Sequence, residues 1–160
     1  MAVAILRFRA GADGDAPFIR ELFAQTRGAE FALAGLSPDA VDQLVDLQLR
    51  AQSAQVAAEH PDARTTVIEK AGTPVGAVVV DRSSTGIHLV DLTIAAGHRR
   101  EGIGSAVLRE LAAESDESEL PLTLHVWANN QAAIGLYKSF GFETVGERSG
   151  YDAMRREPSA

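Results

Sequence analysis

Residues 98–107 read HRREGIGSAV, and this stretch carries more structural information than any other segment of the chain. It follows an apolar, strand-like run from Ile87 to Ala96 and opens a helix whose apolar positions recur at helical spacing. The first turn of a helix presents backbone N–H groups that have no partner within the helix, at the positive end of the helix dipole. Gly102 and Gly104 have no Cβ, so a ligand can approach their backbone closely. The stretch is therefore typical of a turn that binds a phosphate or a diphosphate.

Two common phosphate-binding patterns do not fit this turn. A Rossmann turn needs a third small residue, where this chain has Val107, and an acidic residue after the next strand, yet Leu122 to Ala128 contains no carboxylate. A P-loop needs Gly-Lys-Ser or Gly-Lys-Thr, and neither occurs. The pattern that fits is R-x-x-G-x-G, formed by Arg99, Gly102 and Gly104.

A second segment, residues 122–142, reads LTLHVWANNQAAIGLYKSFGF. It predicts a strand, a helix cap, a short helix and a glycine stop. Five of its positions fit the pattern N-x-x-A-x-x-x-Y-x-x-x-G-F, namely Asn130, Ala133, Tyr137, Gly141 and Phe142.

The two motifs, in this order and at this spacing, resemble the GNAT family of N-acetyltransferases over residues 64–148. The resemblance implies a mixed α/β (α+β) fold, with a twisted sheet of about six or seven strands and helices on both faces. In that fold two central parallel strands splay apart, and the pantetheine arm of acetyl-CoA lies between them. The resemblance thus implies acetyl-CoA as acyl donor and cosubstrate, with an amine as acceptor.

The resemblance also implies which residues contact acetyl-CoA. They lie on the central strand, on the turn that follows it and on the later short helix: Leu92, Thr93, Ile94, Arg99, Arg100, Glu101, Gly102, Ile103, Gly104, Ser105, Asn130, Ala133, Tyr137 and Lys138. The backbone N–H of Ile94 is expected to polarise the thioester carbonyl. Asn130 also suits a helix cap, and a solvated surface position is the better account of Lys138 than a phosphate contact.

Three side chains are candidates for the proton transfers of acyl transfer. Tyr137 matches the tyrosine that protonates the departing thiolate in many relatives, and a phenol has a pKa close to that of a thiol. His125 is a candidate general base because histidine titrates near neutrality. Asp91 is a second candidate, since a carboxylate in an apolar strand is costly unless it has a purpose. A water chain without a dedicated base is the remaining alternative.

Composition limits the other possibilities. The chain has 160 residues, a formal charge of −7 and no cysteine, which predicts a single domain over residues 1–160 and excludes a cysteine nucleophile. The acidic balance argues against nucleic acid as a partner, and histidine spacing predicts no metal site.

Without a signal peptide pattern or a membrane-length apolar run, we expect a cytoplasmic protein with no membrane partner. A homodimer is left open. The alternative functions are a non-catalytic acyl-CoA sensor of the same fold and a nucleotide-binding interaction domain.

The pattern of apolar and turn residues predicts an alternation of strands and helices along the chain. Expected strands are Val3–Arg9, Thr65–Lys70, Val75–Asp81, Ile87–Ala96, Leu122–Ala128, Phe142–Glu147 and Tyr151–Arg155. Expected helices are Asp13–Arg27, a second one from Ser37-Pro38 to about Glu59, and those that open at Ile103 and Asn130, with Gly28–Leu36 irregular.

Overall fold

The structure is a computed structural model that describes residues 5–160, and these divide into two compact units. The first unit extends to Val79 and includes Asp91–Glu101, whereas the second comprises Val80–Val90 and Gly102–Ala160. The boundary between the units falls within two strands, β3 (Thr73–Arg82) and β4 (Ile87–Ile94), so each of these strands contributes residues to both units. The expectation of a single domain over residues 1–160 stays a prediction.

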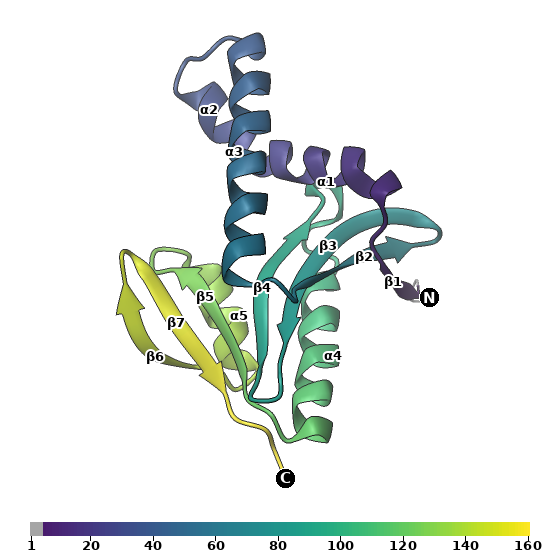
Figure 1. Cartoon of the computed structure of the whole chain (residues 1–160), viewed down its shortest axis with the longest axis vertical. Coiled ribbons are helices and arrows are strands. Elements are labelled where there is room, and N and C mark those ends of the chain that lie inside the picture. Colours follow the sequence, from purple (N-terminus) through teal and green to yellow (C-terminus); the bar gives the residue numbers. More distant parts are fainter. Residues whose placement is uncertain (1–4) are drawn as a thin grey trace. The chain divides into compact units, whose positions relative to one another are not determined.

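The first unit combines a set of helices with antiparallel strands (Figure 1). Its elements are β1 (Leu6–Ala10), the 3-10 turn η1 (Asp13–Asp15), α1 (Ala16–Phe23), the π-helical turn η2 (Ala24–Gly28), α2 (Ala29–Leu33), α3 (Pro38–Glu59), β2 (Arg64–Lys70), most of β3 (Thr73–Arg82) and the end of β4 (Ile87–Ile94). Strand β1 pairs antiparallel with β2, from Leu6 opposite Lys70 to Ala10 opposite Thr66. Val3 and Ala4, which the sequence places in the first strand, lie outside the described residues.

The segment Gly28–Leu36, predicted to be irregular, is instead helical as far as Leu33, so that prediction is wrong. Gly28 is buried, and a Cβ built on it would lie 3.6 Å from Val41 and 3.7 Å from Val45 of α3. Packing against α3 therefore outweighs the low helix propensity of glycine. The next helix, α3, begins at Pro38, as the sequence predicts. The Ser37 hydroxyl caps it by accepting the Ala40 N–H.

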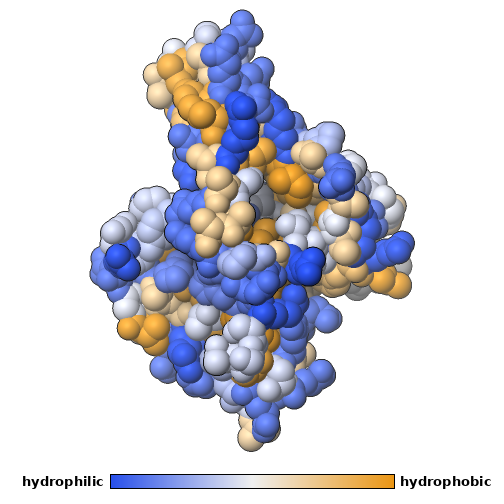
Figure 2. All heavy atoms as spheres, viewed as in Figure 1, coloured by the Kyte–Doolittle hydropathy of each residue, from blue (hydrophilic) through white to orange (hydrophobic). Residues whose placement is uncertain are grey.

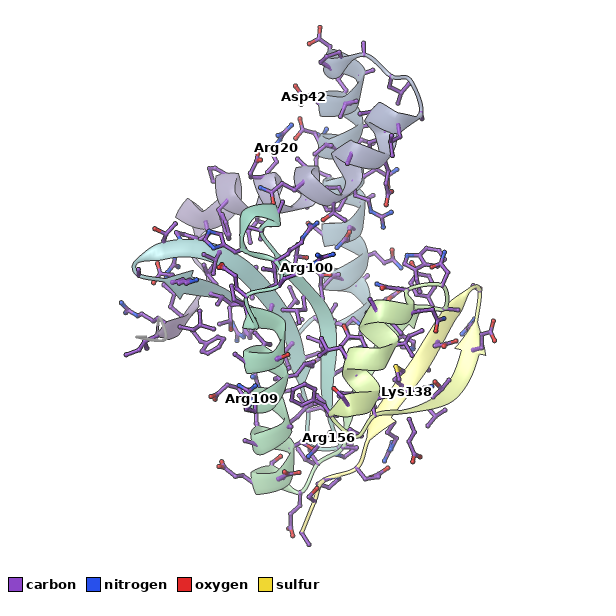
Figure 3. All side chains as sticks on the ribbon, turned by 180° about the vertical axis from the view of Figure 1, so that it is seen from behind. Arg20, Asp42, Arg100, Arg109, Lys138 and Arg156 are labelled. Carbon is purple, nitrogen blue, oxygen red and sulfur yellow. The ribbon has the colours of Figure 1, made fainter. Side chains whose placement is uncertain are left out.

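Ion pairs join α1 to α3 on the outside of this helical set. Arg20 of α1 lies between two carboxylates of α3, with its Nε 2.7 Å from Asp46 and a terminal nitrogen 3.8 Å from Asp42 (Figure 3). Apolar side chains gather over α2 and the turn after it (Figure 2), where Leu33 is 90% exposed.

The second unit is a small sheet with two helices. Its elements are the remainder of β3 and β4, α4 (Ile103–Ser118), β5 (Leu122–Trp127), α5 (Gln131–Ser139), β6 (Glu143–Arg148) and β7 (Tyr151–Arg156). Strand β4 runs parallel to β5, with Ile87 opposite Leu122. Strand β7 pairs antiparallel with both β5 and β6, and the β6–β7 register shifts between Thr144 and Gly146. Helix α5 covers one face of the β5, β7 and β6 strands (Figures 1 and 3).

The hydrogen-bonded strand order is β1-β2-β3-β4-β5-β7-β6, a seven-stranded mixed sheet. This order confirms the predicted mixed α/β class. The splay between β4 and β5 stays a prediction. Among residues 5–160, no helix is both long enough and apolar enough to cross a membrane.

Each unit has its own apolar core. In the first unit, Val67, Ile68 and Val75 are completely buried. In the second, Leu108 of α4 and Leu122 of β5 are equally inaccessible.

The second unit also contains a nearly buried charge, Arg156, which is 9% exposed. Its guanidinium donates to the carbonyl oxygen of Phe140 at the end of α5 and to the Asp116 carboxylate of α4. A buried charge is tolerated here because it is paired and hydrogen-bonded.

Strands β3 and β4 lie close together at Gly76. A Cβ built on Gly76 would lie 2.8 Å from the carbonyl oxygen of Thr93 and 3.0 Å from Cδ1 of Ile94. The backbone of β4 cannot move aside easily, because the Ala95 N–H donates to the Val75 carbonyl at 2.8 Å. Glycine at this position therefore sets the position of β4 where the sequence predicts thioester binding.

We expect Gly76→Ala to lower the free energy of unfolding by about 1–3 kcal/mol, because the added methyl group overpacks a rigid backbone contact. Chemical denaturation of the purified chain measures the change. Gly14→Ala is the matched control, since a Cβ at Gly14 meets nothing within 4 Å. Equal stability of the two variants would contradict this account of the β3–β4 contact.

Candidate active site

The turn between β4 and α4 has an unusual backbone. After β4 ends at Ile94, a short 3-10 turn (Ala96–His98) leads to Arg100, whose φ is 64°, and to Gly102, whose φ is 81°. Helix α4 then begins at Ile103, with Gly102 as its cap residue. A positive φ favours glycine, so Gly102 is required by the turn itself.

Gly104 has a different significance. Its φ is not in the left-handed region, and a Cβ there would meet nothing within 4 Å. The packing of the protein therefore does not require glycine at this position. The first turn of α4 thus leaves space beside Gly104, and diphosphate binding at this turn stays a prediction. Ile103 is 3% exposed, so only its backbone is available to a ligand.

The charged residues of this turn differ in what they contact. Arg99 Nε donates to the Ile94 carbonyl oxygen at 3.3 Å, whereas Arg100 is exposed. The Glu101 carboxylate lies 2.9 Å from Lys70 Nζ and 2.8 Å from His98 Nδ1. These two partners lower the pKa of Glu101, with the Lys70 hydrogen bond as the larger cause. The side chain of Glu101, which the sequence predicts to lie at the cofactor, thus has two protein partners within the first unit.

The end of β4 carries a carboxylate with local partners. Thr93 Oγ1 donates to Asp91 at 3.1 Å, and the Leu92 backbone N–H also donates to it. Burial raises the pKa of Asp91, while Thr93, Leu92 and the charge of Arg27 on η2 oppose that shift. Asp91 is thus a mostly desolvated carboxylate, as its place in an apolar strand predicts.

The π-helical turn η2 also contacts the end of β4 within the first unit. Gln25 Oε1 accepts the backbone N–H of Ala96 at 2.7 Å. Arg27 pairs with Glu30 of α2 at 3.4 Å. The charge that acts on Asp91 therefore comes from a guanidinium that already has a carboxylate partner.

In the second unit, His125 lies on the more exposed face of β5. Leu124 and Val126 on either side of it are buried, whereas His125 itself is exposed. Its neighbour is His88 of β4, with ring centroids 5.3 Å apart. His88 Nδ1 lies 2.8 Å from Thr123 Oγ1. No local sequence pattern pairs His88 with His125. Their proximity follows from the parallel register of β4 and β5, in which His88 lies opposite Thr123, two residues before His125.

Helix α5 positions the remaining predicted residues. The Asn130 side chain accepts the Ala133 N–H at 3.2 Å, which confirms the predicted cap. Tyr137 is half-buried and its ring lies 5.7 Å from that of Phe142. Lys138 is exposed at the surface of α5 (Figure 3). The helix stops at Gly141, whose φ is 94°.

The predicted site residues divide between the units. Asp91, Leu92, Thr93, Ile94, Arg99, Arg100 and Glu101 belong to the first unit; Gly102, Ile103, Gly104, Ser105, His125, Asn130, Ala133, Tyr137 and Lys138 belong to the second. In the part of the chain that the structure describes, no group of three or more histidine or carboxylate side chains could hold a metal ion.

Comparison with known proteins identifies the family of the chain. The profile of the acetyltransferase (GNAT) family matches residues 27–142. The chain belongs to the GNAT acetyltransferase family. This assignment confirms the resemblance inferred from the two motifs, and both motifs lie within or at the end of the matched range.

Both curated proteins and solved structures are similar to this GNAT member. The probable N-acetyltransferase san of Drosophila melanogaster is 36% identical over 75 residues, which cover 46% of this chain and 40% of that protein. The match therefore spans less than half the length of this relative.

Several solved structures cover nearly the whole chain, and two of them are acetyltransferases from Thermoplasma acidophilum and Thermus thermophilus. The PaiA N-acetyltransferase from Thermoplasma acidophilum, in complex with coenzyme A, has a TM-score of 0.71 at 14% identity and covers 96% of this chain and 99% of its own. An acetyltransferase from Thermus thermophilus has a TM-score of 0.70 at 22% identity, with coverage of 98% and 99%. At these identities the likeness establishes the GNAT fold.

The raised pKa of Asp91 predicts a pH-dependent effect on stability. A carboxylate whose pKa is higher in the folded chain stabilises the fold below its unfolded pKa, and this contribution is lost as pH rises through the folded pKa. We therefore expect Asp91→Asn to gain stability relative to the unsubstituted chain as pH rises above about 4. Thermal unfolding of both proteins from pH 4 to pH 8 measures the difference. A difference that does not change with pH would contradict the desolvated state of Asp91.

Proposed function

We propose that this GNAT member is an N-acetyltransferase that transfers an acetyl group from acetyl-CoA to a primary amine of a small molecule or peptide. The observation that carries the proposal is the open first turn of α4, with left-handed Gly102 and uncrowded Gly104, in a chain whose residues 27–142 match an acetyltransferase family. A structural neighbour crystallised with coenzyme A supports the choice of donor. The proposed mechanism is direct attack of the amine on the thioester in a ternary complex, and the absence of cysteine excludes an acyl-cysteine intermediate.

The donor is held by backbone groups and fixed charges. The N–H groups at the start of α4 and the guanidinium of Arg100 provide positive potential for the diphosphate. Arg99 has one nitrogen on the Ile94 carbonyl, and its other N–H groups supply further donors. On α5, Asn130, Ala133 and Lys138 are assigned to the pantetheine arm and the phosphates through the family motif.

Acyl transfer then requires two proton movements. The amine nitrogen forms a bond to the carbonyl carbon and loses a proton, the C–S bond breaks, and the thiolate of coenzyme A takes up a proton. Tyr137 donates the proton to the thiolate, and the Ile94 N–H polarises the carbonyl oxygen as it becomes negative.

His125 is the preferred general base over Asp91. His125 is exposed on β5, so it can accept a proton from a bound amine. Asp91 is desolvated and already receives hydrogen bonds from Thr93 and Leu92, which suits it to hold an ammonium group before proton loss. A cytoplasmic location stays a prediction.

The function is tested by detection of free thiol from acetyl-CoA across polyamines, amino acids, aminoglycosides and peptides. Release of coenzyme A with any acceptor supports the proposal and excludes a sensor that only binds acyl-CoA. Calorimetric binding of acetyl-CoA without turnover on any amine would favour the sensor. Absence of binding would reject both.

We expect Tyr137→Phe to reduce kcat by about a hundredfold, because the phenyl ring cannot protonate the thiolate. The affinity for acetyl-CoA, measured by calorimetry, is expected to stay close to that of the unsubstituted chain. Unchanged turnover would remove Tyr137 from the mechanism.

We also expect His125→Ala to reduce kcat by about a hundredfold or more near neutral pH, since the amine then lacks its base. His60→Ala, at the end of α3, is the control for removal of an imidazole elsewhere. Steady-state rates at saturating acetyl-CoA compare the two variants. Retention of most activity in His125→Ala would instead indicate proton transfer through water.

A further inference from the structure

Glu101 lies in the middle of the R-x-x-G-x-G turn, where a carboxylate is unexpected. A negative charge beside a diphosphate is repulsive unless other groups neutralise it. In the first unit, Lys70 Nζ lies 2.9 Å from Glu101 Oε2 and His98 Nδ1 lies 2.8 Å from Oε1. We name Lys70, His98 and Glu101 the Glu101 clamp.

The clamp uses both oxygens of the carboxylate. An ionised carboxylate only accepts hydrogen bonds, so His98 Nδ1 and Lys70 Nζ are the donors. His98 belongs to the same turn as Glu101, whereas Lys70 is the last residue of β2 and precedes Glu101 by 31 positions. The clamp thus closes the turn on itself and ties it to a strand far away in the sequence.

The clamp adjoins a backbone position that has to be stabilised. Arg100 precedes Glu101 directly and has a φ of 64°, a conformation that costs a non-glycine residue about 1–2 kcal/mol. Such a conformation persists only where its surroundings hold it in place. The side-chain contacts of the next residue, Glu101, supply such a restraint.

We propose that Lys70 and Glu101 are positioning residues that hold the turn in the conformation that receives the diphosphate of acetyl-CoA. This inference rests on the proposed function, because it assigns the turn to the donor. Neither side chain needs to touch the donor. They reduce the loss of conformational freedom on binding, and Lys70 cancels the charge of Glu101 that would otherwise oppose the phosphates.

The test is the Michaelis constant for acetyl-CoA in the full chain, together with the dissociation constant of coenzyme A. We expect Lys70→Met to raise both by about fivefold, the effect of one partly exposed ion pair, while kcat and the KM of the amine stay the same. A general loss of structure would change all four quantities, so this split identifies positioning. In a Glu101→Ala background, Lys70→Met is expected to have no further effect, because the pair is already absent.

Arg82→Met is the matched control. Arg82 at the end of β3 pairs with Glu114 of α4, 32 positions later, so its loss breaks a partly exposed ion pair of similar sequence separation that does not involve the turn. Its KM for acetyl-CoA is expected to equal that of the unsubstituted chain.

The two proposals fail in different ways. If the unsubstituted chain binds coenzyme A but Lys70→Met leaves KM and the dissociation constant unchanged, the clamp has no positioning role and the proposed function stands. Equal effects of Lys70→Met with and without Glu101 would also overturn the clamp. If the unsubstituted chain does not bind coenzyme A, the proposed function itself is wrong.

Discussion

The passage from β4 into α4 depends on two residues with positive φ, Arg100 and Gly102. This turn determines where α4 starts and therefore where its unpaired N–H groups lie. For glycine the conformation is inexpensive, whereas for arginine it is a cost that other contacts offset. The contacts that offset the cost at Arg100 come from the charged side chains of the Glu101 clamp. The backbone geometry of the turn therefore depends on these charges.

Several charged side chains form ion pairs that connect elements of the structure, whereas the carboxylate of Asp91 has a different environment. Arg9 is held between Asp15 and Glu69, and the hydrogen bonds from its guanidinium and from the Ala12 N–H lower the pKa of Asp15 to about 2. Arg156 donates directly to the Phe140 carbonyl at the end of α5 and to Asp116, which also accepts the Ser159 N–H of the C-terminal segment. Asp91 differs, because burial raises its pKa and its partners are a hydroxyl and an N–H group. A carboxylate kept in this state costs stability, which is typical of positions selected for function.

The sequence predicts the features that depend on local chemistry. The Ser37 and Asn130 caps, the start of α4 at Ile103 and the stop at Gly141 all follow from the preferences of single residues, and the structure agrees. The helical state of Gly28 could not be predicted, because its burial against α3 is a tertiary effect that local propensity does not contain.

The same limit applies to the site, where motif spacing identifies the turn, the cap and a tyrosine as candidates. The ion pair of the Glu101 clamp depends on which strand lies beside the turn, and the histidine pair of the second unit depends on parallel register. Neither can be read from one stretch of sequence, because strand pairing joins residues that are far apart in the chain.

The π-helical turn at Ala24–Gly28 has a consequence for the phase of the helix around it. A π turn accommodates one residue more than an α turn, and one residue corresponds to an azimuth of about 100°. Side chains of α2 therefore point in directions that an unbroken continuation of α1 would not give them. Deletion of a single residue here would restore the ordinary period and rotate the whole apolar stripe of α2, including Leu33, about its axis.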